Sequence, residues 1–264
     1  MENCAQPNPK HGVINDGSGY NPRIGIYRRI TITKASFLKH RTVIRTAIIR
    51  LMLTPLSRSV MRGSFITFEG IDGSGKSTVA SRVLMELKRN GACALLTREP
   101  TDTWLGDAAK RLCKVRESNP FGELFLFMAD RAVHTDKIKK WLSQGRVVLC
   151  DRYFDSTVAY QGVTLKPFLK GGTLEWLSKI HSNIVIKPDI TFLLKLSPDD
   201  AIIRISPRKD KIKFERAAFL ADVQKNYLRM ARNDRRFVVI DAALPLEAVV
   251  AEVMGKINKI RVVG

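Results

Sequence analysis

The residues whose types and spacing suit chemistry best form one short, glycine-rich stretch. It consists of Gly70, Ile71, Asp72, Gly73, Ser74, Gly75, Lys76, Ser77 and Thr78. Backbone N–H groups can surround a phosphate chain where side chains are small, and glycine adopts the positive φ angles that such a loop needs. Lys76 adds a point charge for the outer phosphates, and the Ser77 hydroxyl can reach Mg²⁺. The stretch therefore predicts a loop that binds the phosphates of a nucleoside triphosphate.

The segments on either side of this loop agree with that interpretation. The apolar run Phe65–Phe68 predicts a buried strand, and Lys76–Asn90 predicts an amphipathic helix that ends where Gly91 can cap it. A helix that begins at the loop directs the positive end of its dipole at bound phosphates. A chance glycine-rich turn would not show this order of strand, loop and helix.

A second polar group follows the apolar run Val147–Cys150, which predicts another buried strand. Asp151 comes directly after it, at the carboxyl edge where open α/β sheets bind ligands. Its carboxylate can assist Mg²⁺ or position an acceptor group, and Arg152 beside it can hold a second phosphate. A strand end with an ordinary surface salt bridge is the alternative, and the presence of the phosphate-binding loop disfavours it.

From residue 63 onward the chain alternates short apolar strands with helices. Further strands are predicted at Cys93–Leu96, Ile190–Leu196 and Phe237–Ile240, and further helices at Leu105–Cys113, Asn119–Leu142, Leu174–His181, Pro198–Ile205, Phe214–Arg232 and Pro245–Ile260. Two signals mark the start of the longest helix: Asn119 can cap it, and Pro120 is tolerated in its first turn. The alternation predicts an α/β domain over residues 63–264, with a parallel sheet covered by helices on both faces.

The composition gives weaker information about partners. The 264 residues include 45 basic and 25 acidic ones, for a formal net charge of +20. A basic surface suits anionic substrates and attracts nucleic acid without sequence preference, although a basic surface without such a partner is the simpler interpretation. Of the four cysteines, Cys93 and Cys150 lie in apolar runs that predict core positions, and none has the spacing of zinc ligands. This cysteine usage and the lack of a recognisable secretory signal favour a cytoplasmic protein.

The composition of residues 1–62 indicates a separate basic extension. The first 60 residues carry ten basic and two acidic ones, and the first 20 are polar and rich in Gly, Asn and Pro. Lys39–Leu53 can form a basic amphipathic helix, and Arg45 and Arg50 within it exclude a membrane span. Three interpretations stay open: a targeting or membrane-surface helix, a nucleic-acid-binding arm, and an extension without fixed structure. We favour the last, because the first residues lack targeting character.

Four motifs, in this order, resemble the thymidylate kinase family, whose members phosphorylate dTMP to dTDP with ATP. They are Phe-Glu-Gly-Ile-Asp-Gly-Ser-Gly-Lys-Ser-Thr at 68–78, Thr-Arg-Glu-Pro at 97–100, Asp-Arg-Tyr at 151–153 and Ser-Thr-Val-Ala-Tyr-Gln-Gly at 156–162. The resemblance covers about residues 63–260. It implies a P-loop nucleoside monophosphate kinase-like fold with a five-stranded parallel sheet, the cofactors ATP and Mg²⁺, and a place in dTTP biosynthesis. It also implies a homodimer, with helix Asn119–Leu142 as a candidate face.

The resemblance assigns roles around the acceptor. Asp72 matches an acid that reaches the sugar 3′-hydroxyl of dTMP, and Arg98 and Arg152 match arginines that line the dTMP phosphate site. Ser77 and Asp151 are the expected Mg²⁺ residues. Within this assignment the arginines hold the acceptor in line while Lys76 and the metal neutralise the transferred group.

Further residues match those that surround the thymine base and the sugar. Phe127 matches a ring that stacks on thymine, and Arg131 an arginine that bonds near it; residues four apart share a helix face. Two other phenylalanines in the same segment leave an ordinary core role for Phe127 open. Ser156, Tyr160 and Gln161 match residues near base and sugar, and a tyrosine there could disfavour a ribose 2′-hydroxyl.

The flap that covers ATP in this family falls at Arg204–Lys211. Some relatives place an arginine in the phosphate loop where this chain has Gly73-Ser74, so the catalytic positive charge is expected from the flap, with Arg208 or Arg204 as its source. The predicted catalytic residues are Lys76, Asp151, Arg152 and Arg208.

Two other functions stay open beside phosphorylation of dTMP. One is another nucleotide or deoxynucleoside kinase of the same fold, although two arginines at the acceptor site favour a monophosphate. The other is a nucleic-acid-associated ATPase with a basic arm, which the lack of an evident aromatic and basic binding module disfavours. A relative retained only for binding is weaker still, since no expected chemical residue is missing. We expect small-molecule substrates, no specific nucleic acid and no membrane span.

Overall fold

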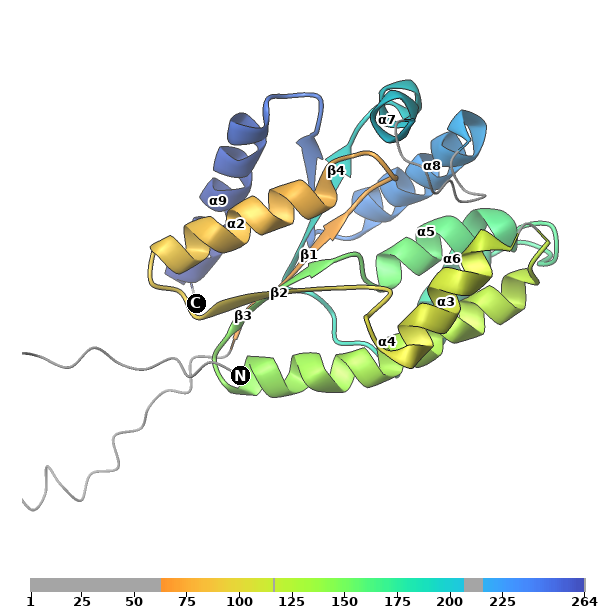
Figure 1. Cartoon of the computed structure of the whole chain (residues 1–264), viewed down its shortest axis with the longest axis horizontal. Coiled ribbons are helices and arrows are strands. Elements are labelled where there is room, and N and C mark those ends of the chain that lie inside the picture. The colour runs from red at the N-terminus through yellow and green to blue at the C-terminus, as the bar shows by residue number, and fades with distance from the viewer. Residues whose placement is uncertain (1–62, 116, 207–215, 264) are drawn as a thin grey trace, which may run out of the picture. The chain divides into compact units, whose positions relative to one another are not determined.

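The computed structural model of this chain describes residues 63–115, 117–206 and 216–263 (Figure 1). Five strands form one sheet in the order β2-β3-β1-β4-β5, and all neighbouring strands are parallel. The predicted α/β fold with a five-stranded parallel sheet is therefore confirmed. The predictions for residues 1–62 lie outside the described residues.

The elements alternate along the chain as the sequence predicts, with one exception. The strands are β1 (Phe65–Glu69), β2 (Ala94–Arg98), β3 (Val147–Asp151), β4 (Ile190–Lys195) and β5 (Phe237–Asp241). The helices are α2 (Lys76–Arg89), α3 (Trp104–Lys114), α4 (Pro120–Ser143), α5 (Phe154–Thr164), α6 (Thr173–His181), α7 (Pro198–Ile205), α8 (Ala217–Asn233) and α9 (Leu246–Val263).

Helix α5 is the exception, because the sequence pattern does not predict a helix there. Eight of its 11 residues are buried, so it has no exposed polar face to produce a helical period. Several of its residues are β-branched, which lowers helix propensity. Contacts with the rest of the fold must stabilise such a helix, and single-sequence patterns do not record them.

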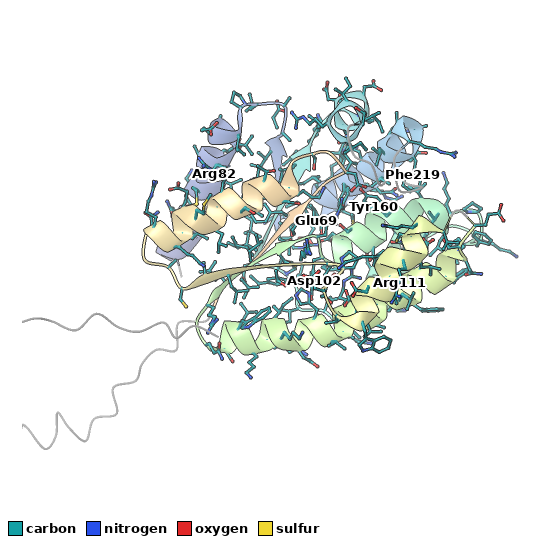
Figure 2. The ribbon with its side chains drawn as sticks, in the orientation of Figure 1. Glu69, Arg82, Asp102, Arg111, Tyr160 and Phe219 are labelled. Atoms are coloured by element: carbon teal, nitrogen blue, oxygen red, sulfur yellow. The ribbon has the colours of Figure 1, made fainter. Side chains whose placement is uncertain are left out.

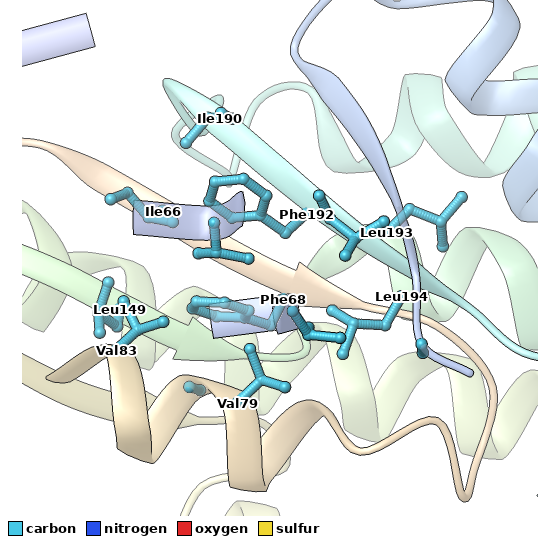
Figure 3. Packing of buried hydrophobic residues seen from close by; sticks show 14 of the residues in the cluster. Ile66, Phe68, Val79, Val83, Leu149, Ile190, Phe192, Leu193 and Leu194 are labelled. Carbon is cyan, nitrogen blue, oxygen red and sulfur yellow. The ribbon is translucent and has the colours of Figure 1, made fainter. Parts of the chain in front are cut away.

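Two layers of helices cover the sheet (Figure 1). Helices α2 and α9 lie on one face, and α4, α5 and α8 lie on the other. Side chains of β1 alternate between these faces: Ile66 and Phe68 pack toward α2, whereas Phe65 packs in the cluster formed with α4 and α5. Figure 3 shows Phe68 against Phe192, with their ring centroids 5.6 Å apart, above Val79 of α2. The opposite face of β1 ends with Glu69, which is buried.

Local signals explain where the longest helix begins. The Asn119 side chain accepts hydrogen bonds from the N–H groups of Phe121 and Gly122, at 2.9 and 3.1 Å, and Pro120 occupies the first turn. The predicted cap is confirmed. Within the described ranges, none of the helices combines the length and the apolar character that crossing a membrane requires.

The two cysteine predictions have different outcomes. Cys150 is buried in the core, as expected. Cys93 is exposed, so its predicted core position is wrong. It precedes the first residue of β2, and β2 is an edge strand, so less of the structure covers this run than covers β3.

Candidate active site

The glycine-rich stretch forms a tight loop between β1 and α2. Gly70 and Gly73 have φ angles of 141° and 84°, and a Cβ atom would lie 2.5 Å from the carbonyl oxygen of Leu194 or of Ala201, respectively. Only glycine fits at these two positions, because both the backbone conformation and the close approach exclude a side chain. The loop therefore presents backbone groups at the carboxyl edge of the sheet.

Lys76 folds back along this loop. Its Nζ donates to the carbonyl oxygen of Ile71 at 2.7 Å and to Ser74 Oγ at 3.3 Å. Burial lowers the pKa of Lys76 to about 8, and the Arg152 charge adds to this, while nearby acids oppose it. The ammonium is thus held inside the loop, where a phosphate oxygen could replace its present acceptors.

Ser77 and Asp151 meet at the start of α2 and the end of β3. The Ser77 hydroxyl donates to Asp151 Oδ2 at 2.5 Å, while the other carboxylate oxygen, Oδ1, is buried without a hydrogen-bond partner among the described residues. An orphaned carboxylate oxygen beside a hydroxyl fits a Mg²⁺ ion, which prefers oxygen ligands and water. These two residues line a cavity of about 350 Å³, here called the β2 cavity, together with Arg98 and Asp102.

A second cavity of about 350 Å³, the α5 cavity, opens beside the first. Its lining residues are Asp72, Glu99, Pro100, Lys110, Cys113, Lys114, Phe127, Arg131, Arg152, Tyr153, Ser156, Thr157, Tyr160 and Gln161. Seven of the eight residues predicted to bind dTMP belong to this set. The consecutive residues Asp151 and Arg152 line the β2 cavity and the α5 cavity, so the two spaces share a boundary.

Arg152, Asp72 and Tyr160 form one connected group in the α5 cavity. Arg152 Nη2 donates to Asp72 Oδ1 at 2.7 Å, and the Tyr160 hydroxyl donates to Asp72 Oδ2 at 2.8 Å. The Tyr160 hydroxyl also accepts from the Asp72 N–H at 3.1 Å, and the Arg152 guanidinium lies 5.2 Å from the centre of the Tyr160 ring. The three side chains thus fix one another and join the phosphate loop to α5.

Arg131 is buried in the wall of the same cavity. It donates to Glu99 Oε2 at 2.7 Å, to His181 Nε2 at 2.9 Å and to the carbonyl oxygen of Tyr153 at 3.3 Å. His181 Nδ1 lies 2.6 Å from the carbonyl oxygen of Leu177 and must donate to it. His181 is therefore neutral, with Nε2 as an acceptor. Burial and the Arg131 charge lower the pKa of His181 to about 3.

Gln161 and Phe127 complete the predicted base-binding wall. Gln161 is buried, yet its Nε2 has no hydrogen-bond partner among the described residues, so it can donate to a ligand in the cavity. Phe127 lines the cavity and also packs against the core. Both interpretations of this phenylalanine are therefore compatible with its position.

Arg98 does not lie with the others. Its side chain is 61% exposed, donates to Asp102 at 2.7 Å and lines the β2 cavity rather than the α5 cavity. Arg204 donates to the carbonyl oxygen of Ala242 at 3.2 Å and lines a third cavity, the α9 cavity, with Gly75 and Leu244. Arg208 lies outside the described residues.

One central residue escapes the sequence interpretation. Glu69 is buried at the end of β1 (Figure 2), and burial, with the Asp155 charge, raises its pKa to about 7. It accepts hydrogen bonds from three groups near the α5 cavity. An acid directly after the apolar run Phe65–Phe68 is the same signal that drew attention to Asp151, so the pattern could have identified it.

A phosphate-binding loop and a separate cavity that meets it at one strand end define the class of P-loop kinases that phosphorylate small molecules. Residues 68–253 match the family described as thymidylate kinase. The chain belongs to the thymidylate kinase family.

Curated relatives agree with this family. The chain is 45% identical over 200 residues to a probable thymidylate kinase of Methanosarcina barkeri, covering 75% of this chain and 97% of the relative. It is 48% identical over 195 residues to a probable thymidylate kinase of Methanoculleus marisnigri, covering 73% and 93%. A Halobacterium salinarum relative of the same description is 40% identical over 189 residues, covering 71% and 92%.

Proposed function

We propose that this chain transfers the γ-phosphoryl group of ATP to dTMP, forming dTDP on the route to dTTP. The observation that carries the proposal is the α5 cavity, which gathers seven of the eight residues expected at dTMP and meets the β2 cavity where Asp151 is followed by Arg152. The acceptor phosphate would then lie at the shared boundary. This is where in-line transfer from a triphosphate on the loop requires it.

The donor phosphates are bound by the loop and Lys76, with the base in the α9 cavity. That cavity begins at Gly73 and Gly75 and continues to Leu244 and Leu246, so it offers apolar contacts next to the phosphate loop. Ser77 and Asp151 would hold Mg²⁺, as favoured by the buried Asp151 Oδ1, which has no hydrogen-bond partner in the described part of the chain. When bound, this ion neutralises charge on the outer phosphates and lowers the cost of bringing two anions together.

The acceptor is bound by charge at one end and by shape at the other. Arg152, already fixed by Asp72, bonds the dTMP phosphate, and Asp72 accepts from the sugar hydroxyl. Gln161 donates to an oxygen of the base from its amide nitrogen, to which no described residue bonds, and Phe127 stacks on the ring. Residues that touch the phosphate neutralise it, whereas residues that touch the base select it.

A flap arginine and a partner subunit complete the proposal. Arg204, which lies at the α9 cavity, or Arg208 would supply positive charge to the transferred group, because Gly73 and Ser74 offer none. The proposed homodimer uses the outer side of α3 and α4, where the side chains of Trp104 and Phe125 are 75% and 60% exposed. Exposed large apolar side chains on two helices that pack on each other are typical of an interface.

The test is steady-state kinetics of the full chain with ATP, Mg²⁺ and dTMP, dUMP, dCMP or thymidine. We expect dTMP to give the highest kcat/KM. Arg98 lines the β2 cavity, beside the shared boundary where the acceptor phosphate would lie, and is proposed to bond that phosphate from this side. Arg98→Ala would then remove a charged contact worth about 1.5–3 kcal/mol, so the KM for dTMP should rise about 10- to 100-fold with the KM for ATP unchanged. Arg111→Ala, on the exposed side of α3 (Figure 2), is the matched control. ATP hydrolysis stimulated by DNA, without turnover of dTMP, would refute the proposal.

A further inference from the structure

Glu69 holds three elements together at the centre of the molecule (Figure 2). Its Oε1 accepts from the Tyr153 N–H at 2.8 Å, and its Oε2 accepts from the Ser156 hydroxyl at 2.6 Å and from the Tyr227 hydroxyl at 2.7 Å. These donors come from the turn after β3, from α5 and from α8. All three are neutral donors, so the carboxylate is an anchor rather than half of an ion pair.

The first consequence of this anchor concerns the backbone at Arg152. Arg152 has a φ of 68°, a left-handed conformation that is costly for a residue with a side chain. Its N–H donates to the carbonyl oxygen of Phe68 at 3.0 Å, and the next N–H, of Tyr153, donates to Glu69. Two consecutive residues of β1 thus hold two consecutive N–H groups of the turn. The Glu69 carboxylate supplies one of these two backbone contacts.

The second consequence concerns the Arg152 side chain. Above its pKa of about 7, the ionised Glu69 carboxylate can only accept hydrogen bonds, so the Ser156 proton points at Glu69 and the Ser156 oxygen is left to accept. Arg152 Nη1 donates to that oxygen at 3.2 Å and to the carbonyl oxygen of Gly70 at 3.2 Å. Glu69 therefore fixes the direction of the Ser156 hydroxyl, and this hydroxyl fixes one edge of the guanidinium.

From these contacts we propose that Glu69 is a positioning residue for phosphoryl transfer, which holds the turn at Arg152 and, through Ser156, aims the guanidinium at the acceptor phosphate. The proposal rests on the proposed function, because it assigns Arg152 to that phosphate. Glu69 does not line the α5 cavity: among the described residues its carboxylate bonds to Tyr153 and Ser156, which do line it, and to Tyr227, which does not.

The experiment compares Glu69→Gln with Asp155→Asn in the full chain. Asp155 is also buried and lies beside Ser156 on α5, but it pairs with Arg236 at 2.6 Å, away from Arg152. Glutamine places an N–H₂ donor where one of the three donors must bind. We expect kcat/KM for dTMP to fall about 10- to 100-fold in Glu69→Gln, with the KM for ATP within about twofold of the unaltered chain. Asp155→Asn removes a charge that raises the pKa of Glu69, so Glu69 stays an ionised acceptor in this variant. Asp155→Asn should therefore lower the unfolding midpoint and leave both constants unchanged.

A double-mutant cycle tests the route through Ser156. If Glu69 acts through this hydroxyl, Ser156→Ala combined with Glu69→Gln should lose little more than Glu69→Gln alone. Tyr227→Phe is the second variant, for the case that Glu69→Gln does not fold, because it removes only one hydroxyl donor from Glu69. It should lower kcat/KM for dTMP as well. Additive losses in the cycle, or equal losses for Asp155→Asn, would overturn the proposal. If the unaltered chain does not turn over dTMP, the proposed function is overturned as well. If the unaltered chain is active and Glu69→Gln has the same kcat/KM for dTMP, this inference alone is overturned.

Discussion

Replacing His181 with glutamine gives the sharpest test of the electrostatics behind the α5 cavity. His181 Nε2 accepts from Arg131 at 2.9 Å, and its Nδ1 donates to the carbonyl oxygen of Leu177. Protonation would put a second cation against the Arg131 guanidinium in a buried site. The side-chain amide of glutamine offers an NH₂ donor group and an acceptor oxygen, so His181→Gln can keep both contacts but cannot take up a proton.

The magnitude follows from the pKa of His181, which is lowered to about 3. In the unfolded chain the pKa of histidine is about 6.5. Between these values the unfolded chain binds a proton that the folded chain does not, so stability falls as the pH falls. From pH 7 to pH 5, the linkage relation gives a loss of about 2 kcal/mol in the free energy of unfolding.

Other buried acids act in the opposite direction. The pKa of Glu69 is raised to about 7, and burial also raises the pKa of Asp155. The folded chain binds protons at these groups where the unfolded chain does not, so their contribution to stability grows as the pH falls toward the unfolded value. For Glu69 the same relation gives a gain of about 2 kcal/mol from pH 7 to pH 5. The unaltered chain alone therefore shows little net change from this pair.

The assay is urea unfolding of the unaltered chain and of His181→Gln at pH 7 and at pH 5. The acids are present in both proteins, so their contribution cancels when the two pH changes are compared. We expect the unaltered chain to lose about 2 kcal/mol more than the variant between these pH values. If both proteins change by the same amount, His181 does not remain neutral against Arg131, and the reasoning fails.

Three further perturbations follow from the same structure. Gly75→Ala should lower the free energy of unfolding in urea by about 1–2 kcal/mol, because residue 75 has a φ of 87°. Gly73→Ala should lower it more, because its Cβ would also lie 2.5 Å from the Ala201 carbonyl oxygen. Equal losses would contradict the packing of the loop on α7. Asp151→Asn should raise the Mg²⁺ concentration for half-maximal activity about tenfold, and an unchanged titration would remove Asp151 from the metal site. Phe125→Glu should give a monomer in sedimentation measurements if α4 forms the dimer interface, and a persisting dimer would place the interface elsewhere.

The order of strands and helices could be predicted because it depends on local periodicity. Phe65–Phe68 and Val147–Cys150 are apolar enough to identify central strands, and Asn119 announces a helix start in its own neighbourhood. Helix α5 could not be found this way, because its burial removes the polar face on which the pattern depends. Exposure of Cys93 depends on the edge position of β2, which is a property of the whole sheet.

The site shows the same division. The loop from Gly70 to Ser77 carries its chemistry in consecutive residues, so its sequence predicts the phosphate site directly. The contacts that fix Arg131 come from Glu99 and His181, which are 32 and 50 residues away, and no local pattern announces them. The roles assigned to Arg98, Phe127 and the flap remain predictions for the experiments above.

The hydrogen bond between Glu69 and Tyr227 joins residues 158 positions apart. A ribosome releases the N-terminal part of a chain first, so the phosphate loop and α2 leave it long before α8. Until α8 docks, the Glu69 carboxylate lacks one of its hydrogen-bond donors. Until β4 is synthesised, β1 also lacks the strand that pairs with it on one side. Translation therefore supplies the triphosphate loop early and finishes the acceptor side late, so a chain stalled before α8 lacks one of the three donors that hold the Glu69 carboxylate.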